Sequence, residues 1–294
     1  MVTYIGRFAP SPTGPLHLGS VVAAAASYLD ARAHDGRWQL RIEDLDTGRC
    51  DPDVARTMIN TLAQLGMQAD EPVYWQSRRQ STYQQAFQSL SAAGVVYGCA
   101  CTRAQVRRHA PHPGVYAGTC RSGLSDGRVA RCARVRIDRL EDRFIDRLAG
   151  PQHSLQGRDY GDPVVLRADG SYAYVLAGAV DDAECGITDV VRGDDLLPTT
   201  ATQRCLLTLL GLPTPRYAHV PVVRGADGRK LSKQNHAPAI DPMQPIETIR
   251  AAFRALGLPE TITAAREAKT LPELWQAGVI AWRERLSQLN SHRS

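Results

Sequence analysis

Residues 7–20, Arg7-Phe-Ala-Pro-Ser-Pro-Thr-Gly-Pro-Leu-His-Leu-Gly-Ser20, are the stretch that decides the fold of this chain. A strand-like run over residues 2–8 leads into a loop rich in proline and glycine, and an alanine-rich helical segment begins near His17 and Gly19. Many folds build a phosphate site from a strand, a tight turn and a helix start, because the first helical N–H groups point at the anion. The stretch has neither the P-loop spacing nor the three-glycine dinucleotide spacing, so neither generic motif applies.

The next regular segment, residues 38–43, is predicted to be a half-buried strand. Apolar and polar side chains alternate along it, and Glu43 ends its polar face. Residues 21–33 have helical spacing and connect the two strands. If the strands are parallel neighbours, Arg7 and Glu43 reach the same carboxyl edge of a sheet, where open α/β sheets bind their ligands.

The rest of the chain alternates between helical, irregular and α/β patterns. Asp51 and Pro52 are a typical N-cap and first residue for the first of the predicted helices. We expect helices over 52–66 and 78–94, an irregular inserted subdomain over 98–160, a resumed α/β pattern at 163–167 and 172–177, a strand that opens into a helix at 190–197, and helical core stripes after residue 241.

The composition limits the class of protein. A chain of 294 residues predicts about two domains, and an apolar share of 43% is ordinary for a globular protein. The most apolar run near the N-terminus, residues 21–29, is too short to span a bilayer and follows no signal-peptide pattern, so we expect a cytoplasmic protein without membrane contact. Seven cysteines in such a chain favour a metal site or buried thiols over a disulfide framework.

Arginines crowd one stretch of the chain, although the net charge is only +5. A basic zone of this kind can follow a phosphate backbone. A solvated surface balanced by Glu141, Asp142 and Asp146 would give the same pattern, so both interpretations stay open. The stretch contains Arg103, Arg107, Arg108, Arg121, Arg128, Arg131, Arg134, Arg136, Arg139, Arg143 and Arg147.

Two segments far apart in the chain carry residues suited to ATP chemistry. His17-Leu-Gly-Ser20 opens a helix, and Lys230-Leu-Ser-Lys-Gln234 lies in a loop next to Gly225 and Gly228. Helix-start N–H groups and an imidazole can hold phosphates, and a glycine lets a nucleotide approach the backbone closely. Two lysines can neutralise the charge that develops as pyrophosphate leaves. Either segment alone is a weak signal, because each pattern is common by chance.

Together and in this order, the two segments resemble the nucleotide-binding motifs of class I aminoacyl-tRNA synthetases. The first segment, starting at Arg7, is similar to the glutamyl-tRNA synthetase branch of that family, as are Leu40-Arg-Ile-Glu-Asp-Leu-Asp46, Val191-Arg-Gly-Asp-Asp-Leu-Leu197 and Tyr217-Ala-His-Val-Pro221. The resemblance covers most of residues 2–240. It implies an α/β protein, with a Rossmann-like parallel-sheet catalytic domain, a zinc-binding insertion and a short helical C-terminal region.

The resemblance also implies how these parts divide the chain. We expect the first half of the catalytic domain at 1–97, an inserted zinc-binding and acceptor-facing subdomain at 98–160, the second half with the lysine loop at 161–240, and a short helical region without an anticodon-binding domain at 241–294.

Full-length members of the branch carry a large anticodon-binding region, whereas only a short segment follows residue 240 here. The short C-terminal segment, the motif Lys230-Leu-Ser-Lys-Gln-Asn-His-Ala237 and the cysteine pattern together resemble a short subgroup of the branch. Members of that subgroup activate L-glutamate with ATP and Mg²⁺ without needing tRNA. The resemblance then implies transfer of glutamate to the cyclopentenediol of queuosine in the anticodon of tRNA(Asp). We expect the protein to be a monomer. The alternatives are a short enzyme that charges the 3′ end of tRNA(Glu) and an inactive, zinc-stabilised RNA-binding protein.

Free glutamate has two carboxylates and an ammonium group, so its pocket needs cationic groups and an anion. Arg7 and Arg192 can grip carboxylates bidentately, and Glu43 can meet the ammonium. A structural ion pair is the alternative for Arg7 or Glu43 alone. The residues nominated for glutamate, in agreement with the resemblance, are Arg7, Ala9, Ser11, Glu43, Tyr174 and Arg192.

The resemblance further implies the groups that act on ATP. His17, Lys230 and Lys233 are nominated as catalytic. The full ATP-binding set adds backbone and hydroxyl groups to these side chains and comprises His17, Gly19, Ser20, Lys230, Ser232 and Lys233.

Cys99, Cys101 and Cys120 lie in the irregular segment, and a thiolate cluster in a core-poor subdomain suits tetrahedral zinc. The resemblance implies Tyr116 as the fourth ligand of one structural zinc ion. His109, His112 and Cys132 are nearby alternatives for the fourth position. The remaining thiols, Cys50, Cys185 and Cys205, are expected to be small buried side chains.

Overall fold

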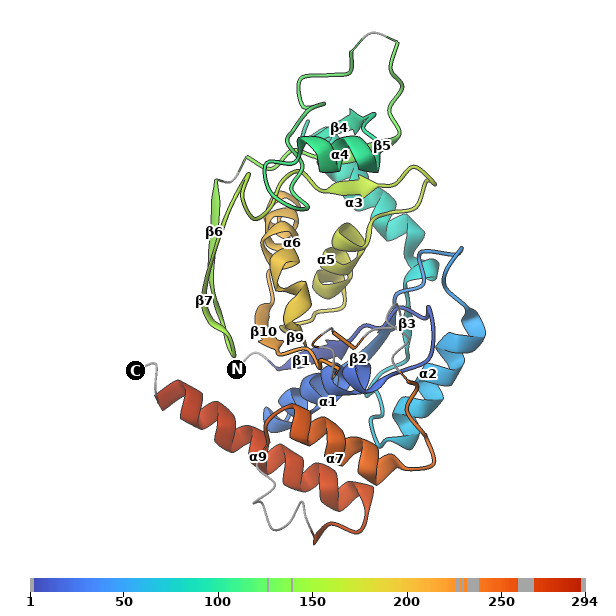
Figure 1. The fold of residues 1–294 in the computed structure, drawn as a ribbon, viewed down its shortest axis with the longest axis vertical. Helices are drawn as coiled ribbons and strands as arrows, with labels where there is room; N and C mark the ends of the chain where they lie inside the picture. The colour runs from blue at the N-terminus through green and yellow to red at the C-terminus, as the bar shows by residue number, and fades with distance from the viewer. Residues whose placement is uncertain are drawn as a thin grey trace. The chain divides into compact units, whose positions relative to one another are not determined.

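The computed structural model describes residues 3–125, 127–138, 140–225, 228, 230–231, 238–258 and 267–291. Contacts divide the chain into two compact units, which are drawn as one ribbon in Figure 1. We call them the sheet unit, which contains Met1–Trp75, Ile187–Asp195 and Arg216–Ser294, and the cysteine unit, which contains Gln76–Gly186 and Leu196–Pro215. Both units are assembled from segments far apart in the sequence, and the predicted four-part division of the chain stays a prediction.

A parallel sheet organises the sheet unit. Its strands are β1 (Ile5–Phe8), β2 (Arg37–Ile42), β3 (Tyr74–Trp75), β9 (Asp189–Gly193) and β10 (Arg216–Val220). The strand order is β10-β9-β1-β2-β3, and β1 pairs in parallel with β2 on one side and β9 on the other. The chain thus reverses its direction across the sheet at β1, which creates a ligand-binding switch point at the carboxyl end of that strand. The predicted α/β class and the parallel pairing of the first two strands are confirmed.

The sheet unit also contains helices, and one of them begins as the sequence predicts. They are α1 (Leu18–Ala33), α2 (Pro52–Gln64), α7 (Pro245–Ala255) and α9 (Leu271–Ser291). The Asp51 carboxylate accepts a hydrogen bond from the Asp53 N–H, and Pro52 is the first residue of α2. The N-cap and the following proline therefore fix the start of α2.

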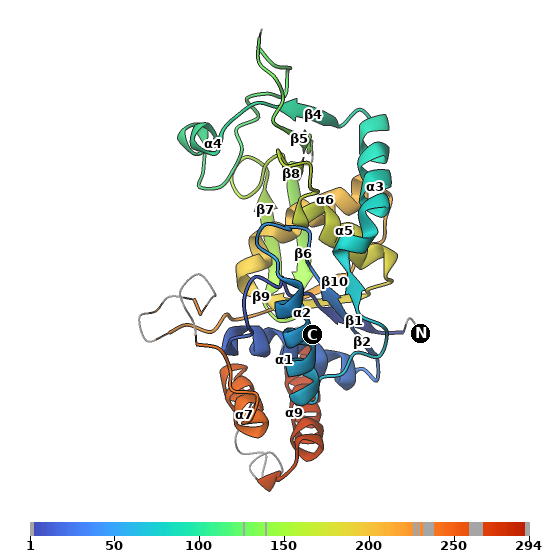
Figure 2. The ribbon, with the colours of Figure 1, turned by 90° about the vertical axis from the view of Figure 1, so that its right-hand side faces the viewer.

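The C-terminal helices α7 and α9 both pack against α1 (Figure 2). Ile249, Phe253 and Trp282 are buried there. Trp282 Nε1 donates to Asp30 Oδ1 at 2.9 Å, so the indole N–H is satisfied inside the core. The predicted core role of these apolar stripes is confirmed.

The cysteine unit contains a small antiparallel sheet, a hairpin and several helices. Its elements are η1 (Gln76–Arg79), α3 (Gln80–Ala92), β4 (Val96–Cys99), α4 (Arg103–His109), β5 (Cys132–Val135), β6 (Glu141–Asp146), β7 (Gly150–Leu155), β8 (Val164–Leu166), α5 (Tyr174–Glu184) and α6 (Leu197–Leu209). The sheet has the order β4-β5-β8, and β6 pairs with β7. Residues 163–167 thus contribute a strand to this antiparallel sheet, and residues 172–177 contain the start of α5.

The segment 98–160 is more regular than its sequence predicts, because charged residues occupy inward positions of the hairpin. Asp142 and Asp146 of β6 are fully buried, and Arg204 Nε donates to Asp142 Oδ2 at 2.8 Å. An apolar alternation is therefore absent although the strand is half-buried. The interpretation of these two aspartates as surface charges that balance the arginines is wrong.

Asp162 connects several segments of the cysteine unit. Arg121 donates to both of its carboxylate oxygens at 2.5 Å, and Tyr97 Oη donates to Oδ2 at 2.5 Å. The Ile137 N–H adds a bond to Oδ1 at 3.0 Å. Burial favours a higher pKa for Asp162, but the bonds from Arg121, Tyr97 and Ile137 outweigh it and hold the pKa below its usual range.

We expect the Asp162→Asn substitution to lower the free energy of unfolding of the cysteine unit by about 3 kcal/mol, because it removes the buried carboxylate to which Arg121 donates two hydrogen bonds. Urea unfolding near neutral pH measures this loss. A carboxylate with a lowered folded-state pKa stabilises above its unfolded pKa, and that stability disappears as the pH falls through the folded value. The difference between wild type and variant should therefore shrink below a pH of about 4.

Asp159→Asn is the matched control, since Asp159 is an exposed aspartate paired with Arg158. Its effect should stay within about 0.5 kcal/mol. Equal losses in the two variants would contradict the connecting role of Asp162.

Candidate active site and metal centre

The loop after β1 lies against the end of β2. The Glu43 N–H donates to the Pro10 carbonyl at 3.0 Å, and the Asp51 N–H donates to the Pro12 carbonyl at 3.0 Å. Arg7 within β1 is buried. The structure thus gathers the beginning of the first motif and Glu43 at the carboxyl edge of the sheet, the place that the two parallel strands predict.

The other residues predicted to bind the substrate glutamate differ in their exposure and in their neighbours. Ala9 is half-buried and Ser11 is exposed in the loop after β1. Glu43 Oε1 lies 3.3 Å from Nη2 of the buried Arg41, so an ion pair accompanies any ligand role of Glu43. Tyr174 begins α5 in the cysteine unit, and the residue is 47% exposed.

Arg192 is held by a residue that the sequence analysis did not single out. Arg192 and His219 are register partners on β9 and β10, and both are buried. Arg192 Nε donates to His219 Nε2 at 3.0 Å, and its guanidinium carbon lies 5.4 Å from the Tyr217 ring centroid. Since arginine is only a donor, this bond assigns the acceptor tautomer to His219 Nε2. The available signal was the stretch Tyr217-Ala-His-Val-Pro221, in which His219 had no assigned role.

His17 caps α1. Its Nδ1 accepts a hydrogen bond from the Ser20 N–H at 3.3 Å, and the residue is buried. Because Nδ1 is the acceptor, Nε2 carries the proton in the neutral ring and can donate to a ligand. Ser20 and the other N–H groups of the first turn give this helix start its positive end.

The second motif meets the first at Gly19. A Cβ built on Gly19 would lie 3.1 Å from His17 Nδ1 and 3.4 Å from the Leu231 carbonyl oxygen. Nearby, the Ile240 N–H donates to the Leu16 carbonyl at 3.1 Å. A side chain larger than glycine would therefore crowd His17 where the lysine loop passes the start of α1.

Two aspartates after β9 hold the loop that contains Lys230. Asp195 Oδ2 lies 2.5 Å from Lys230 Nζ, and Asp194 Oδ1 accepts from the Val222 N–H at 3.1 Å. A Cβ on Gly193 would come within 2.6 Å of Asp195 Oδ1, so a larger residue there would displace the carboxylate that pairs with Lys230. Lys230 thus reaches the carboxyl edge of the sheet. The predicted residues Ser232 and Lys233 lie outside the described residues.

Three thiols and one phenol converge in the cysteine unit. The sulfur atoms of Cys99, Cys101 and Cys120 all lie within 4.8 Å of one another. Tyr116 Oη is 3.4 Å from Cys99 Sγ and 3.8 Å from Cys101 Sγ, and it accepts from the Cys120 N–H at 2.9 Å. Cys132 Sγ instead contacts the Cys99 carbonyl at 3.7 Å. Among the alternatives for the fourth position, the geometry favours Tyr116.

The spacing of these four groups fits a tetrahedral metal ion. Zinc with Zn–S bonds of about 2.3 Å places its sulfur ligands about 3.8 Å apart, and Cys101 Sγ lies 3.6 Å from Cys120 Sγ. Burial favours a higher pKa for Cys99, but its bonds with Tyr116, the Cys101 backbone and Arg134 lower the pKa to about 7. Burial raises the pKa of Tyr116, and its hydrogen bonds with Cys120 and Cys99 raise it further. A phenolate at this position therefore requires a cation beside it.

The remaining thiols follow the prediction only in part. Cys205 is buried within α6, as expected. Cys50 and Cys185 are half-buried, because they lie after the regular elements rather than inside them.

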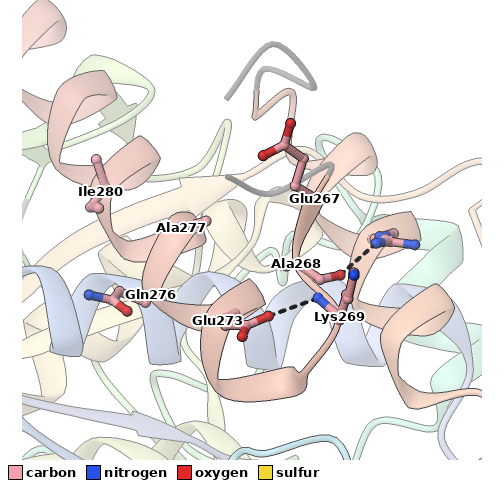
Figure 3. A pocket seen from close by; sticks show the side chains of 8 residues that line it. Glu267, Ala268, Lys269, Glu273, Gln276, Ala277 and Ile280 are labelled. Carbon is pink, nitrogen blue, oxygen red and sulfur yellow. Dashed lines mark hydrogen bonds between the residues drawn. The ribbon is translucent and has the colours of Figure 1, made fainter. Parts of the chain in front are cut away.

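A further pocket lies in the C-terminal part of the sheet unit (Figure 3). Arg250 Nη2 donates to the Ala268 carbonyl at 2.9 Å, and the Lys269 N–H donates to Glu273 Oε2 at 2.8 Å. The charged side chains that line this pocket carry both signs and therefore indicate no particular ligand. The lining residues, none of which belongs to the predicted site, are Arg250, Glu267, Ala268, Lys269, Glu273, Gln276, Ala277 and Ile280.

Within the part of the chain that the structure describes, no helix combines the length and the apolar character needed to cross a bilayer.

Known proteins resemble the chain over nearly its whole length. The family model for the catalytic domain of class I tRNA synthetases (E and Q) matches residues 4–253. The glutamyl-Q tRNA(Asp) synthetase of Bordetella bronchiseptica is 50% identical over 292 residues, which cover 97% of this chain and 90% of the relative. The protein of the same name from Aromatoleum aromaticum is 48% identical over 283 residues, which cover 95% of this chain and 89% of the relative.

Solved structures agree with the family model. A glutamate tRNA ligase from Elizabethkingia meningosepticum, in complex with its amino acid, is 25% identical with a TM-score of 0.74 and is matched over 94% of this chain and 64% of its own length. The glutamate-tRNA synthetase from Elizabethkingia anophelis is 28% identical with a TM-score of 0.68, over 79% of this chain and 53% of its own. The chain therefore spans between half and two thirds of these two solved chains.

Proposed function

The chain belongs to the class I tRNA synthetases of the glutamate and glutamine branch, and from this premise we propose that it activates L-glutamate with ATP and transfers it to the queuosine base of tRNA(Asp). One observation carries this proposal: curated relatives of that activity are about half identical over nearly the whole chain. Charging of the 3′ end of tRNA(Glu) is not favoured, because those relatives share the queuosine-directed activity in their names.

The reaction has two steps that leave no covalent bond to the enzyme. The α-carboxylate of glutamate attacks the α-phosphorus of ATP, which arrives with Mg²⁺, and pyrophosphate leaves. A hydroxyl of the queuosine cyclopentenediol then attacks the carbonyl of the adenylate, and AMP leaves. Positioning and charge stabilisation therefore supply most of the rate acceleration.

The side chains at the carboxyl edge of the sheet divide this work. We propose that Arg7 and Arg192 grip the two carboxylates of glutamate and that Glu43 receives its ammonium group. The buried position of both arginines supports this, because a guanidinium fork removed from water binds a carboxylate more strongly. Ala9 and Ser11 complete the proposed glutamate pocket of the sheet unit, and Tyr174 is a further glutamate-binding residue proposed from the sequence.

The start of α1 and the lysine loop are the proposed ATP site. His17 donates from Nε2 to a phosphate oxygen, while Gly19 and Ser20 present backbone at the positive helix end. Lys230 and Lys233 stabilise the departing pyrophosphate, with Ser232 between them. The contact between Gly19 and the Leu231 carbonyl supports this shared site.

We further propose that Cys99, Cys101, Tyr116 and Cys120 hold one structural zinc ion. Four protein ligands leave no open position, so the ion would supply a crosslink between the end of β4 and the loop after α4 rather than chemistry. The proposal also includes the predicted division of the chain into two catalytic halves and an insertion. It places the protein, as a monomer, in the cytoplasm, where its tRNA substrate is found.

The test of the proposed function locates the transferred glutamate. The protein is incubated with ATP, radiolabelled glutamate and queuosine-containing tRNA(Asp), and the label is mapped by nuclease digestion. We expect the label at the anticodon, together with ATP–pyrophosphate exchange that needs no tRNA. Label at the 3′ adenosine, or exchange that depends on tRNA, would contradict the proposal.

We expect Gly19→Ala to raise the KM for ATP by about tenfold, because the added methyl group crowds the His17 ring and the Leu231 carbonyl. Exchange kinetics at saturating glutamate measure the change. Gly48→Ala is the control, since its Cβ would meet only Asp46 Oδ1 at 3.7 Å. An unchanged KM for ATP in the Gly19→Ala variant would contradict the proposed close approach of ATP to the backbone at this position.

A further inference from the structure

The arginines of the basic stretch differ in whether they already have an acidic partner. Arg136 pairs with Asp138 at 3.0 Å and Arg143 with Glu141 at 3.0 Å. Just beyond the stretch, Arg158 pairs with Asp159 at 2.7 Å. Their charge is largely neutralised within the protein, so they are poor candidates for an external anion.

Helix α4 carries the contrasting group. Arg103, Arg107 and Arg108 are all exposed, and among the described residues they form no ion pair. Residues 72–125 contain no aspartate or glutamate, so α4 has no acidic neighbour on its own segment. In the described part of the chain, no carboxylate pairs with these three positive charges, which lie on two helical turns and are exposed.

Helix α4 is also fixed in place. Thr102 and Gln105 form a capping box, with the Gln105 N–H donating to Thr102 Oγ1 at 3.2 Å and the Thr102 N–H donating to Gln105 Oε1 at 2.9 Å. Val106 packs against the cluster of Cys99, Tyr116 and Cys120. The helix backbone that carries the arginines is thus held before any ligand arrives, which reduces the entropy lost on binding.

We propose that Arg103, Arg107 and Arg108 of α4 form a contact surface for the phosphate backbone of the tRNA substrate. This inference rests on the proposed function for the identity of the RNA. The partner is an RNA because closely spaced, fixed guanidinium groups without carboxylate partners match the repeated phosphates of a nucleic acid backbone. The surface contributes affinity and position, and it reads no base.

The test compares two triple variants that remove the same charge. Arg103→Ala/Arg107→Ala/Arg108→Ala is expected to weaken tRNA binding about 10- to 100-fold and to lower the slope of log affinity against log salt by up to about three. Arg136→Ala/Arg143→Ala/Arg158→Ala is the control and should change affinity by less than about threefold. ATP–pyrophosphate exchange without tRNA should be the same in both variants and in wild type.

A second variant separates phosphate contact from a structural role of the helix. Arg103→Lys/Arg107→Lys/Arg108→Lys keeps the charge and should retain most of the affinity and of the salt slope. Equal losses in the two alanine triples, or a lysine triple as weak as the alanine one, would overturn the inference. Binding is measured directly with tRNA(Asp), so a wild-type protein that binds RNA but labels the 3′ end would contradict the proposed function and leave this surface standing.

Discussion

Replacing Arg192 by alanine is expected to lower kcat/KM for glutamate in ATP–pyrophosphate exchange by about a thousandfold. Arg192 is only 6% exposed, so the substitution would leave a substrate carboxylate buried without its cation. The KM for glutamate should rise much more than the KM for ATP, because the proposed contact is with the amino acid. Arg192→Lys should recover little activity, since an ammonium group cannot form the bidentate fork.

Arg37→Ala is the matched control for this loss. Arg37 lies in the same sheet but is 51% exposed and paired with Glu71. Its removal should change exchange less than about twofold. If Arg192→Ala keeps exchange within tenfold of wild type, Arg192 does not bind glutamate.

His219 offers a finer test of the same site. His219→Gln keeps an acceptor near Arg192 Nε, whereas His219→Phe keeps only the ring shape. We expect the phenylalanine variant to have the higher KM for glutamate and an unchanged KM for ATP. Equal behaviour of the two variants would mean that the hydrogen bond to Arg192 has no positioning role.

Metal removal is the second change with a large expected effect. Stripping zinc with a strong chelator should lower the melting temperature of the cysteine unit markedly, because metal binding free energy in such clusters contributes directly to folding. The wild-type protein should contain one zinc ion per chain, and Cys99→Ser should contain much less. Metal content and thermal unfolding measure both effects.

The pH dependence of zinc retention follows from the same thiols. The pKa of Cys99 is lowered to about 7, so its thiolate is stable above that pH and protons compete with the metal as the pH falls through it. Zinc release should therefore increase on acidification. Cys185→Ser is the control and should keep the full metal content, since Cys185 is not part of the cluster. A purified protein that holds no metal and is insensitive to chelation would remove the zinc proposal.

The regular elements near the N-terminus could be predicted because their signals are local. The alternation over residues 38–43 and the Asp51-Pro52 helix start appear as β2 and α2. Inside the cysteine unit the same reasoning failed, since buried Asp142 hides the half-buried character of β6. A pattern of hydrophobicity cannot reveal a strand whose inward positions are charged and paired.

The candidate site divides in the same way. Residue types in sequence motifs, together with the family resemblance, nominated His17, Arg192 and the three clustered cysteines. They could not give the partners of those residues, such as His219 or the Leu231 carbonyl, because these lie far away in the chain. The roles of the nominated residues stay predictions until the variants are measured.

By itself, the sequence determined the α/β class, the parallel start of the sheet and the two motifs of the branch, because each depends on residues within a few positions of one another. Only the tertiary structure decided which arginines pair with acidic side chains, how close Tyr116 Oη lies to the thiols, and how Arg192 is oriented. Those outcomes depend on distances between side chains from different segments, and such distances exist only after the segments have packed.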